Sequence, residues 1–140
     1  MAPVARYLSA ACLAGALSLA SLPSRAGHDY EEPVDFTPSD QVKQLLDIGE
    51  QVTFVDIREA ADYGKGHLPN AISIPVSEFG HRWSEIPKTG RVILYCTCPP
   101  GQRDETYAFL LLRQQRYLNI TFIDGGYAGW VKRGYPVAAP

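Results

Sequence analysis

Long apolar runs, cysteines and basic clusters are all scarce in this 140-residue chain. The Ala- and Leu-rich stretch over residues 7–22 has 16 residues, fewer than the roughly 20 that a helix needs to span a bilayer. Lys and Arg number 13 against 15 Asp and Glu, and they form no basic stripe. The charge therefore argues against a nucleic-acid partner, and the short run argues against a lasting membrane span.

The apolar stretch has the surroundings of a secretory signal. Arg6 precedes it, and small residues stand beyond it at Ser24 and Ala26. A positive start, a short apolar run and small residues before the cut are typical of a cleaved export signal. We therefore predict a signal peptide over 1–26, a flexible arm over 27–36, one domain over 37–140, and a periplasmic or secreted location. An uncleaved membrane anchor is the alternative for the same stretch.

Only three cysteines are present, and Cys12 lies within the predicted signal. The exported chain would keep Cys96 and Cys98, one residue apart. A disulfide between two such close residues does not cross-link distant parts of a domain, although an oxidising compartment permits disulfides. The pair therefore points to thiol chemistry. If the two sulfurs bond to each other, the ring is small and should be easily reduced.

Short apolar runs alternate with helical segments along the rest of the chain. We expect strands at 52–56, 71–74, 92–95 and 120–123, and helices at 37–48, 59–63, 105–116 and 127–133. The run 92–95 has the continuous hydrophobicity of a strand that is buried on both faces. This alternation predicts an α/β fold with a mainly parallel central sheet flanked by helices.

The arrangement around Cys96 carries the chemistry. Cys96 directly follows the apolar run 92–95, and a loop leads from it to Arg103 and a helix. Ligands of an open parallel sheet bind beyond the carboxyl ends of its strands, and the free N–H groups at the helix start favour a thiolate there. The arrangement predicts a nucleophilic thiol, with Arg103 able to hold an anion such as thiosulfate. The alternative is a buried, inert cysteine.

Four motifs, in the right order, resemble the rhodanese-like family. They are the Asp-x-Arg strand end at 56–58, the Gly-His element at 66–75, the Tyr-Cys approach to the active-site loop at 95–96, and Gly-Gly-x-x-x-Trp at 125–130. The resemblance implies a three-layer fold and a thiosulfate or persulfide sulfurtransferase or sulfur carrier. Its partners would be a sulfane-sulfur donor and a thiol or cyanide acceptor. No metal or organic cofactor is required, and we expect a monomer.

The resemblance assigns catalysis to the two cysteines but leaves open which is the nucleophile. Cys98 lies five residues before Arg103, which is the family's Cys-x4-Arg spacing, with Gly101 in register. Cys96 directly follows the strand motif, which favours it slightly, and the loop is then two residues longer. The residues implied in substrate binding are Arg58, Gly101, Gln102 and Arg103. An ion pair with Asp56 is the structural alternative for Arg58.

The loop departs from the family pattern in two ways. Pro99 and Pro100 lack N–H groups and cannot help to hold a persulfide anion. Asp104 and Glu105 suit the helix dipole, but they compete with a bound anion and oppose a nearby thiolate. A neutral or protein-bound donor is then easier to accommodate than thiosulfate.

Two other classes compete with sulfur transfer. A phosphatase or arsenate reductase of a related fold needs a Cys-x5-Arg loop, and neither cysteine has that spacing. A catalytically silent binding module, or a Cys-x-Cys redox or soft-metal site, is the stronger alternative.

Overall fold

The computed structural model of the chain describes residues 34–97 and 103–139. Its centre is a five-stranded sheet in the order β1-β5-β4-β2-β3, and every neighbouring pair is parallel. The strands are β1 (Phe36–Thr37), β2 (Val52–Asp56), β3 (Ile72–Ser73), β4 (Arg91–Tyr95) and β5 (Ile120–Ile123). The parallel sheet confirms the predicted α/β fold.

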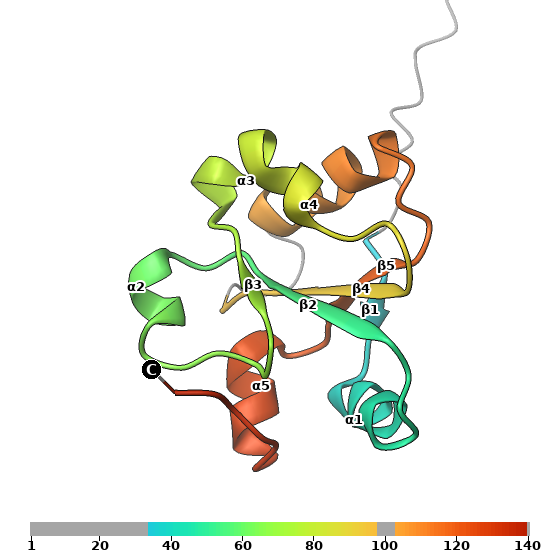
Figure 1. Cartoon of the computed structure of the whole chain (residues 1–140). Helices are drawn as coiled ribbons and strands as arrows, with labels where there is room; N and C mark the ends of the chain where they lie inside the picture. The colour runs from blue at the N-terminus through green and yellow to red at the C-terminus, as the bar shows by residue number, and fades with distance from the viewer. Residues whose placement is uncertain (1–33, 98–102, 140) are drawn as a thin grey trace, which may run out of the picture. The chain divides into compact units, whose positions relative to one another are not determined.

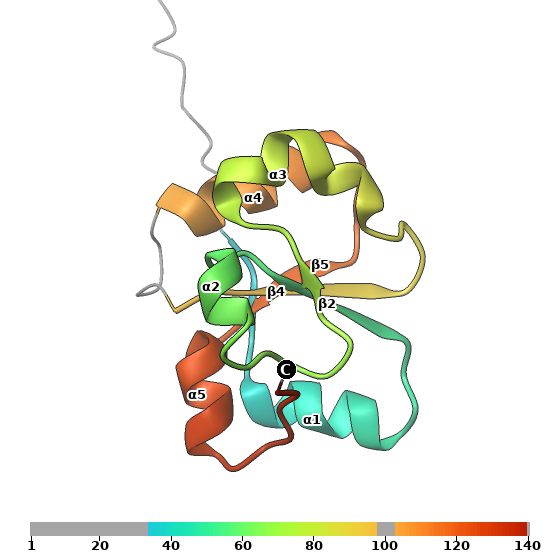
Figure 2. The same cartoon turned by 60° about the vertical axis from the view of Figure 1, so that its left-hand side comes forward.

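Helices cover both faces of the sheet. They are α1 (Ser39–Asp47), α2 (Ala60–Tyr63), α3 (Val76–Arg82), α4 (Arg103–Gln114) and α5 (Gly126–Lys132), with a short 3₁₀ turn, η1 (Trp83–Glu85), after α3. Helices α3 and α4 lie over one face, and α1 and α5 lie over the other (Figures 1 and 2). Among the helices of the described ranges, none combines the length and apolar character needed to cross a bilayer.

Side-chain alternation along β4 divides the core into two layers. Val92 and Leu94 lie in the cluster that α3 and α4 complete with Phe79 and Phe109. Ile93 and Tyr95 lie in the cluster on the opposite face, together with Val42 of α1 and Trp130 of α5. Successive residues of a strand face opposite sides of the sheet. The same alternation sends the side chain of Cys96, which directly follows β4, into the α3–α4 layer.

The start of the fold differs in detail from the expectation. Phe36 pairs with Phe122 in the sheet, so the boundary expected at residue 37 falls within a short strand. Pro38 occupies the N-cap position of α1, where no side chain forms a capping hydrogen bond. The Ser39 hydroxyl instead donates to the carbonyl of Asp124 at 3.0 Å, which ties the start of α1 to the end of β5.

Candidate active site at the end of strand β4

The backbone of Cys96 is fixed by the start of α5. The carbonyl of Cys96 accepts a hydrogen bond from the N–H of Tyr127 at 2.9 Å. Gly126 has a φ of +54°, and a Cβ at this position would lie 2.2 Å from the same carbonyl oxygen. Both the left-handed backbone and the close approach require glycine here. The Gly-Gly motif recognised in the sequence therefore positions the cysteine.

The side chain of Cys96 meets a buried carboxyl group. Cys96 is 2% exposed and Glu105, in the first turn of α4, is 4% exposed. The Cys96 Sγ lies 3.1 Å from Oε1 of Glu105, which is a hydrogen bond when the sulfur is a thiol. Cys96 is disulfide-bonded in the structure. The sulfur then has no proton, and the same separation is a sulfur–oxygen contact.

Several of the predicted site residues lie outside the described part of the chain. These are Cys98, Gly101 and Gln102, together with the loop residues Pro99 and Pro100. Cys12 and Cys98, the other cysteines of the chain, both fall outside it. Arg103 is described: it is the first residue of α4 and its side chain is exposed. The substrate-binding role of these residues stays a prediction.

Arg58 is held by the scaffold. Its Nε donates to Oδ1 of Asp56 at 2.9 Å, and its Nη2 donates to the carbonyl of Gly66 at 2.8 Å. The guanidinium lies 3.9 Å from the centre of the Tyr127 ring, and the residue is 7% exposed. Burial opposes the charge, but the hydrogen bond and charge of Asp56 outweigh it and raise the pKa of Arg58. These contacts support the ion-pair interpretation of Arg58 and do not test a role in substrate binding.

The Asp56–Arg58 pair is part of a wider buried arrangement around Tyr95. The Tyr95 hydroxyl accepts a hydrogen bond from the N–H of Leu68 at 3.1 Å, and the Arg58 guanidinium lies 5.5 Å from the Tyr95 ring centre. Burial, followed by the charge of Asp56, raises the pKa of Tyr95 far above its usual range. The phenol therefore stays neutral and joins the Gly-His element to β4.

The local sequence does not show which acid at the start of α4 is buried. Asp104 and Glu105 are adjacent and suit the helix dipole equally, but Asp104 is exposed and Glu105 is buried. The buried residues of α4 are Glu105, Ala108, Phe109 and Leu112, at helical spacing. Extending the apolar stripe of α4 back by one turn would have placed Glu105 on the inward face.

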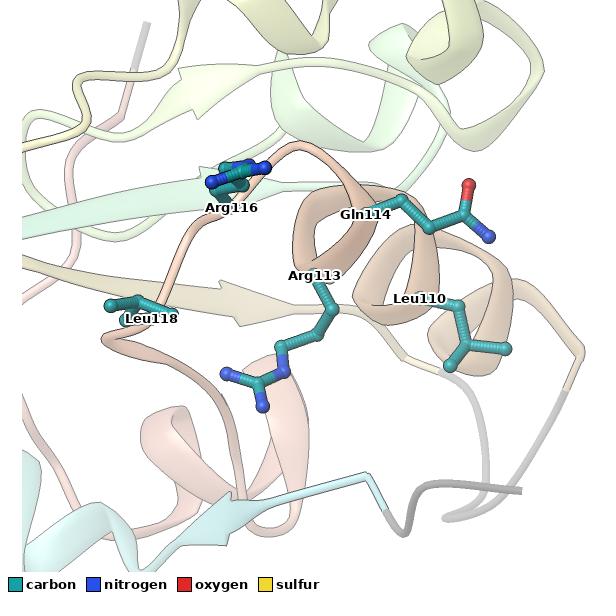
Figure 3. A pocket seen from close by; sticks show the side chains of 5 residues that line it. All are labelled: Leu110, Arg113, Gln114, Arg116 and Leu118. Carbon is teal, nitrogen blue, oxygen red and sulfur yellow. The ribbon is translucent and has the colours of Figure 1, made fainter. Parts of the chain in front are cut away.

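A surface hollow of about 460 Å³ lies on the other half of α4. Figure 3 shows the side chains that line it, which come from the end of α4 and the segment that leads to β5: Leu110, Arg113, Gln114, Arg116 and Leu118. Neither Cys96 nor Glu105 belongs to this lining. Within the described ranges, no group of three or more His, Cys, Asp or Glu side chains is placed to hold a metal ion.

Comparison with known proteins agrees with this architecture. Residues 38–133 match the model of the family described as rhodanese-like domain. A sulfurtransferase from Allochromatium vinosum is 36% identical over 103 residues, which cover 73% of this chain and 92% of that protein. Among solved structures, the Alr3790 protein from Anabaena superposes with a TM-score of 0.62 at 25% identity, covering 74% of this chain and 91% of that one.

A rhodanese-related protein from Thermoplasma volcanium shares the fold at a TM-score of 0.62 and 24% identity, covering 76% of this chain and 99% of that one. The chain therefore belongs to the rhodanese-like domain family, in which the 36% identical relative is a sulfurtransferase.

Proposed function

We propose that the chain is an exported sulfurtransferase or sulfur carrier that holds sulfane sulfur as a persulfide on the Cys96–Cys98 pair. The observation that carries the proposal is the position of Cys96, directly beyond the carboxyl end of β4 and fixed by the start of α5. Ligands of parallel sheets bind at this edge. The similar sulfurtransferase from Allochromatium vinosum supports the same chemistry.

The reaction has two half-steps. A cysteine sulfur attacks the outer sulfur of a donor such as thiosulfate or a persulfide, and the remainder of the donor leaves with the bonding electron pair. The enzyme persulfide then gives its outer sulfur to a thiol or to cyanide, and the cysteine is restored. Neither half-step requires a metal or an organic cofactor.

The two cysteines have distinct roles in this proposal. In this scheme Cys96 accepts the sulfur, because it directly follows β4. Cys98 attacks the Sγ of the Cys96 persulfide when no acceptor arrives, which releases sulfide and leaves a disulfide.

Intact mass spectrometry tests the function directly. The reduced chain, its Cys96→Ser variant and its Cys98→Ser variant are incubated with thiosulfate or with a polysulfide. We expect the mass of one sulfur atom to be added to the unmodified chain, to be absent from Cys96→Ser only, and to be removed by cyanide. Absence of the gain with every donor, while both thiols remain titratable, would leave a binding or redox module.

Export rests on residues 1–26 and is tested separately. Expression in a Gram-negative host, followed by N-terminal sequencing of the periplasmic fraction, should find a chain that begins at Gly27. Recovery of the uncut chain in the membrane fraction would instead favour the anchor interpretation of residues 7–22.

A further inference from the structure

The contact between Cys96 and Glu105 has a chemical consequence beyond positioning. A carboxyl group at 4% exposure lies 3.1 Å from the sulfur on which the proposed function depends. Since a buried charge is costly, such a group is rarely placed on the apolar face of a helix without a partner that it can bind. The thiol of reduced Cys96 is one donor within reach of this carboxyl group.

We propose that Glu105 accepts the proton of the Cys96 thiol and passes it to the departing thiol of a hydropersulfide donor, and that it selects such donors over thiosulfate. The inference rests on the proposed function, because it assigns the donor class and the proton path of the same site. Glu105 is a catalytic residue in this scheme, since its carboxyl group contacts the reacting sulfur.

The step balances in atoms and electrons. The Cys96 thiol loses its proton to the Glu105 carboxylate while its sulfur forms a bond to the outer sulfur of R–S–SH. The S–S bond of the donor breaks, and its electron pair leaves with R–S⁻. Glu105 returns the proton to R–S⁻, so that R–SH leaves and Cys96 carries the hydropersulfide. The cysteine sulfur is oxidised, the inner sulfur of the donor is reduced, and the net charge does not change.

Thiosulfate fits this site less well. It brings two negative charges and no proton, and its leaving group, sulfite, is also an anion. A carboxylate in contact with the sulfur repels each of those charges, and the repulsion is stronger at a buried site than in water. Glu105 therefore favours donors that arrive neutral or singly charged.

The neighbouring elements carry other ionisable groups. They are Arg103 and Asp104 on α4, Asp56 and Arg58 at the end of β2, Glu78, His81 and Arg82 on α3, and Asp124 and Tyr127 at the start of α5. Asp56 and Arg58 form an ion pair with each other, and so do Glu78 and Arg82. His81, Arg103, Asp104 and Asp124 are exposed. Glu105 is the one whose contact with the Cys96 sulfur the structure describes.

Alkylation kinetics test the proton contact without any sulfur transfer. The full chain with Cys98→Ser is reduced, freed of reductant, and treated with neutral iodoacetamide or anionic iodoacetate across the neutral and alkaline range. Fragmentation of the peptide that contains Cys96 gives its rate. Glu105→Gln is the test variant. Asp104→Asn removes the neighbouring, exposed carboxylate of the same helix turn and is the matched control.

We expect Glu105→Gln to lower the pH at which Cys96 becomes half-reactive and to raise the iodoacetate-to-iodoacetamide rate ratio about tenfold, because a contacting negative charge is lost. Asp104→Asn should change both readouts much less. In the sulfur-loading assay, the preference for cysteine hydropersulfide, whose ammonium and carboxylate charges cancel, over thiosulfate should fall in Glu105→Gln by a similar factor. Circular dichroism establishes that the variant is folded.

Identical pH profiles and rate ratios in Glu105→Gln and its parent overturn the inference. If Glu105→Gln does not fold, the parent chain is compared with mercaptoethanol, a free thiol. An iodoacetate-to-iodoacetamide rate ratio for Cys96 about tenfold below that of mercaptoethanol supports the inference, and an equal ratio overturns it. Failure of the proposed function looks different. In that case no donor adds sulfur to the parent, while the alkylation profile still responds to Glu105→Gln.

Discussion

Replacing Gly126 with alanine tests how the start of α5 holds Cys96. Gly126 has a φ of +54°, and an added Cβ would lie 2.2 Å from the Cys96 carbonyl oxygen. The N–H of Tyr127 donates to that same oxygen. A methyl group cannot be accommodated unless α5 and the end of β4 move apart, which breaks the hydrogen bond.

The magnitude follows from comparison with Gly134, which also has a left-handed backbone, with a φ of +71°, but has no atom within 4 Å of an added Cβ. Gly134→Ala carries the backbone strain alone, about 1–2 kcal/mol. Gly126→Ala carries the same strain and, in addition, the clash and the lost hydrogen bond. Together these should cost about 2–4 kcal/mol more.

Urea unfolding of the reduced chain and of both variants measures the difference in the free energy of unfolding. The Cys96 alkylation rate, measured in the same samples, should change in Gly126→Ala and not in Gly134→Ala. Equal destabilisation by the two substitutions would refute the argument, because it would mean that the contact with the Cys96 carbonyl imposes no constraint.

Two further predictions concern charged groups away from the sulfur. Asp56→Asn should lower the free energy of unfolding by about 3–5 kcal/mol, because it leaves Arg58, at 7% exposure, without its carboxylate partner. Urea unfolding measures this loss of stability. A loss near zero would contradict the buried ion pair. The Tyr135 hydrogen bond, followed by Arg133, holds the pKa of Asp40 below its ordinary value of 3.8. The carboxylate therefore favours the folded state above that value, and the benefit is lost as the pH falls through the lowered pKa. Asp40→Asn should weaken the dependence of the free energy of unfolding on pH in the acid range, as measured by tryptophan fluorescence. An unchanged pH dependence would count against the hydrogen bond between Tyr135 and Asp40.

Much of the fold follows from hydrophobic patterning. The strands at 52–56 and 120–123 and the strand before Cys96 were expected from their apolar runs, and the structure has them. Helix α3 was not expected. It has seven residues and one fully buried side chain, Phe79, so it presents no periodic stripe. Phe79 packs in the same cluster as Phe109 of α4, a contact between distant segments that the local sequence does not reveal.

The position of Cys96 was predictable, but the polarity of its surroundings was not. Cys96 was expected to follow a buried strand, and it does. What the local sequence did not distinguish was which of two adjacent acids faces that sulfur. A rotation of about 100° per residue around a helix separates Asp104 from Glu105. The inward direction is set by Ala108, Phe109 and Leu112, one and two turns later.

The charge around Cys96 also bears on the donor. Two arginines were predicted to bind substrate, and Arg58 is engaged by Asp56, by a backbone carbonyl and by the Tyr127 ring. The Asp-x-Arg motif thus stabilises the scaffold in this structure. Of the two arginines, Arg103 is the exposed one. Asp104 next to Arg103 and Glu105 at the sulfur are both acids, so the described groups at this helix start carry no excess of positive charge. Such a site disfavours a dianion such as thiosulfate more strongly than a donor of lower charge.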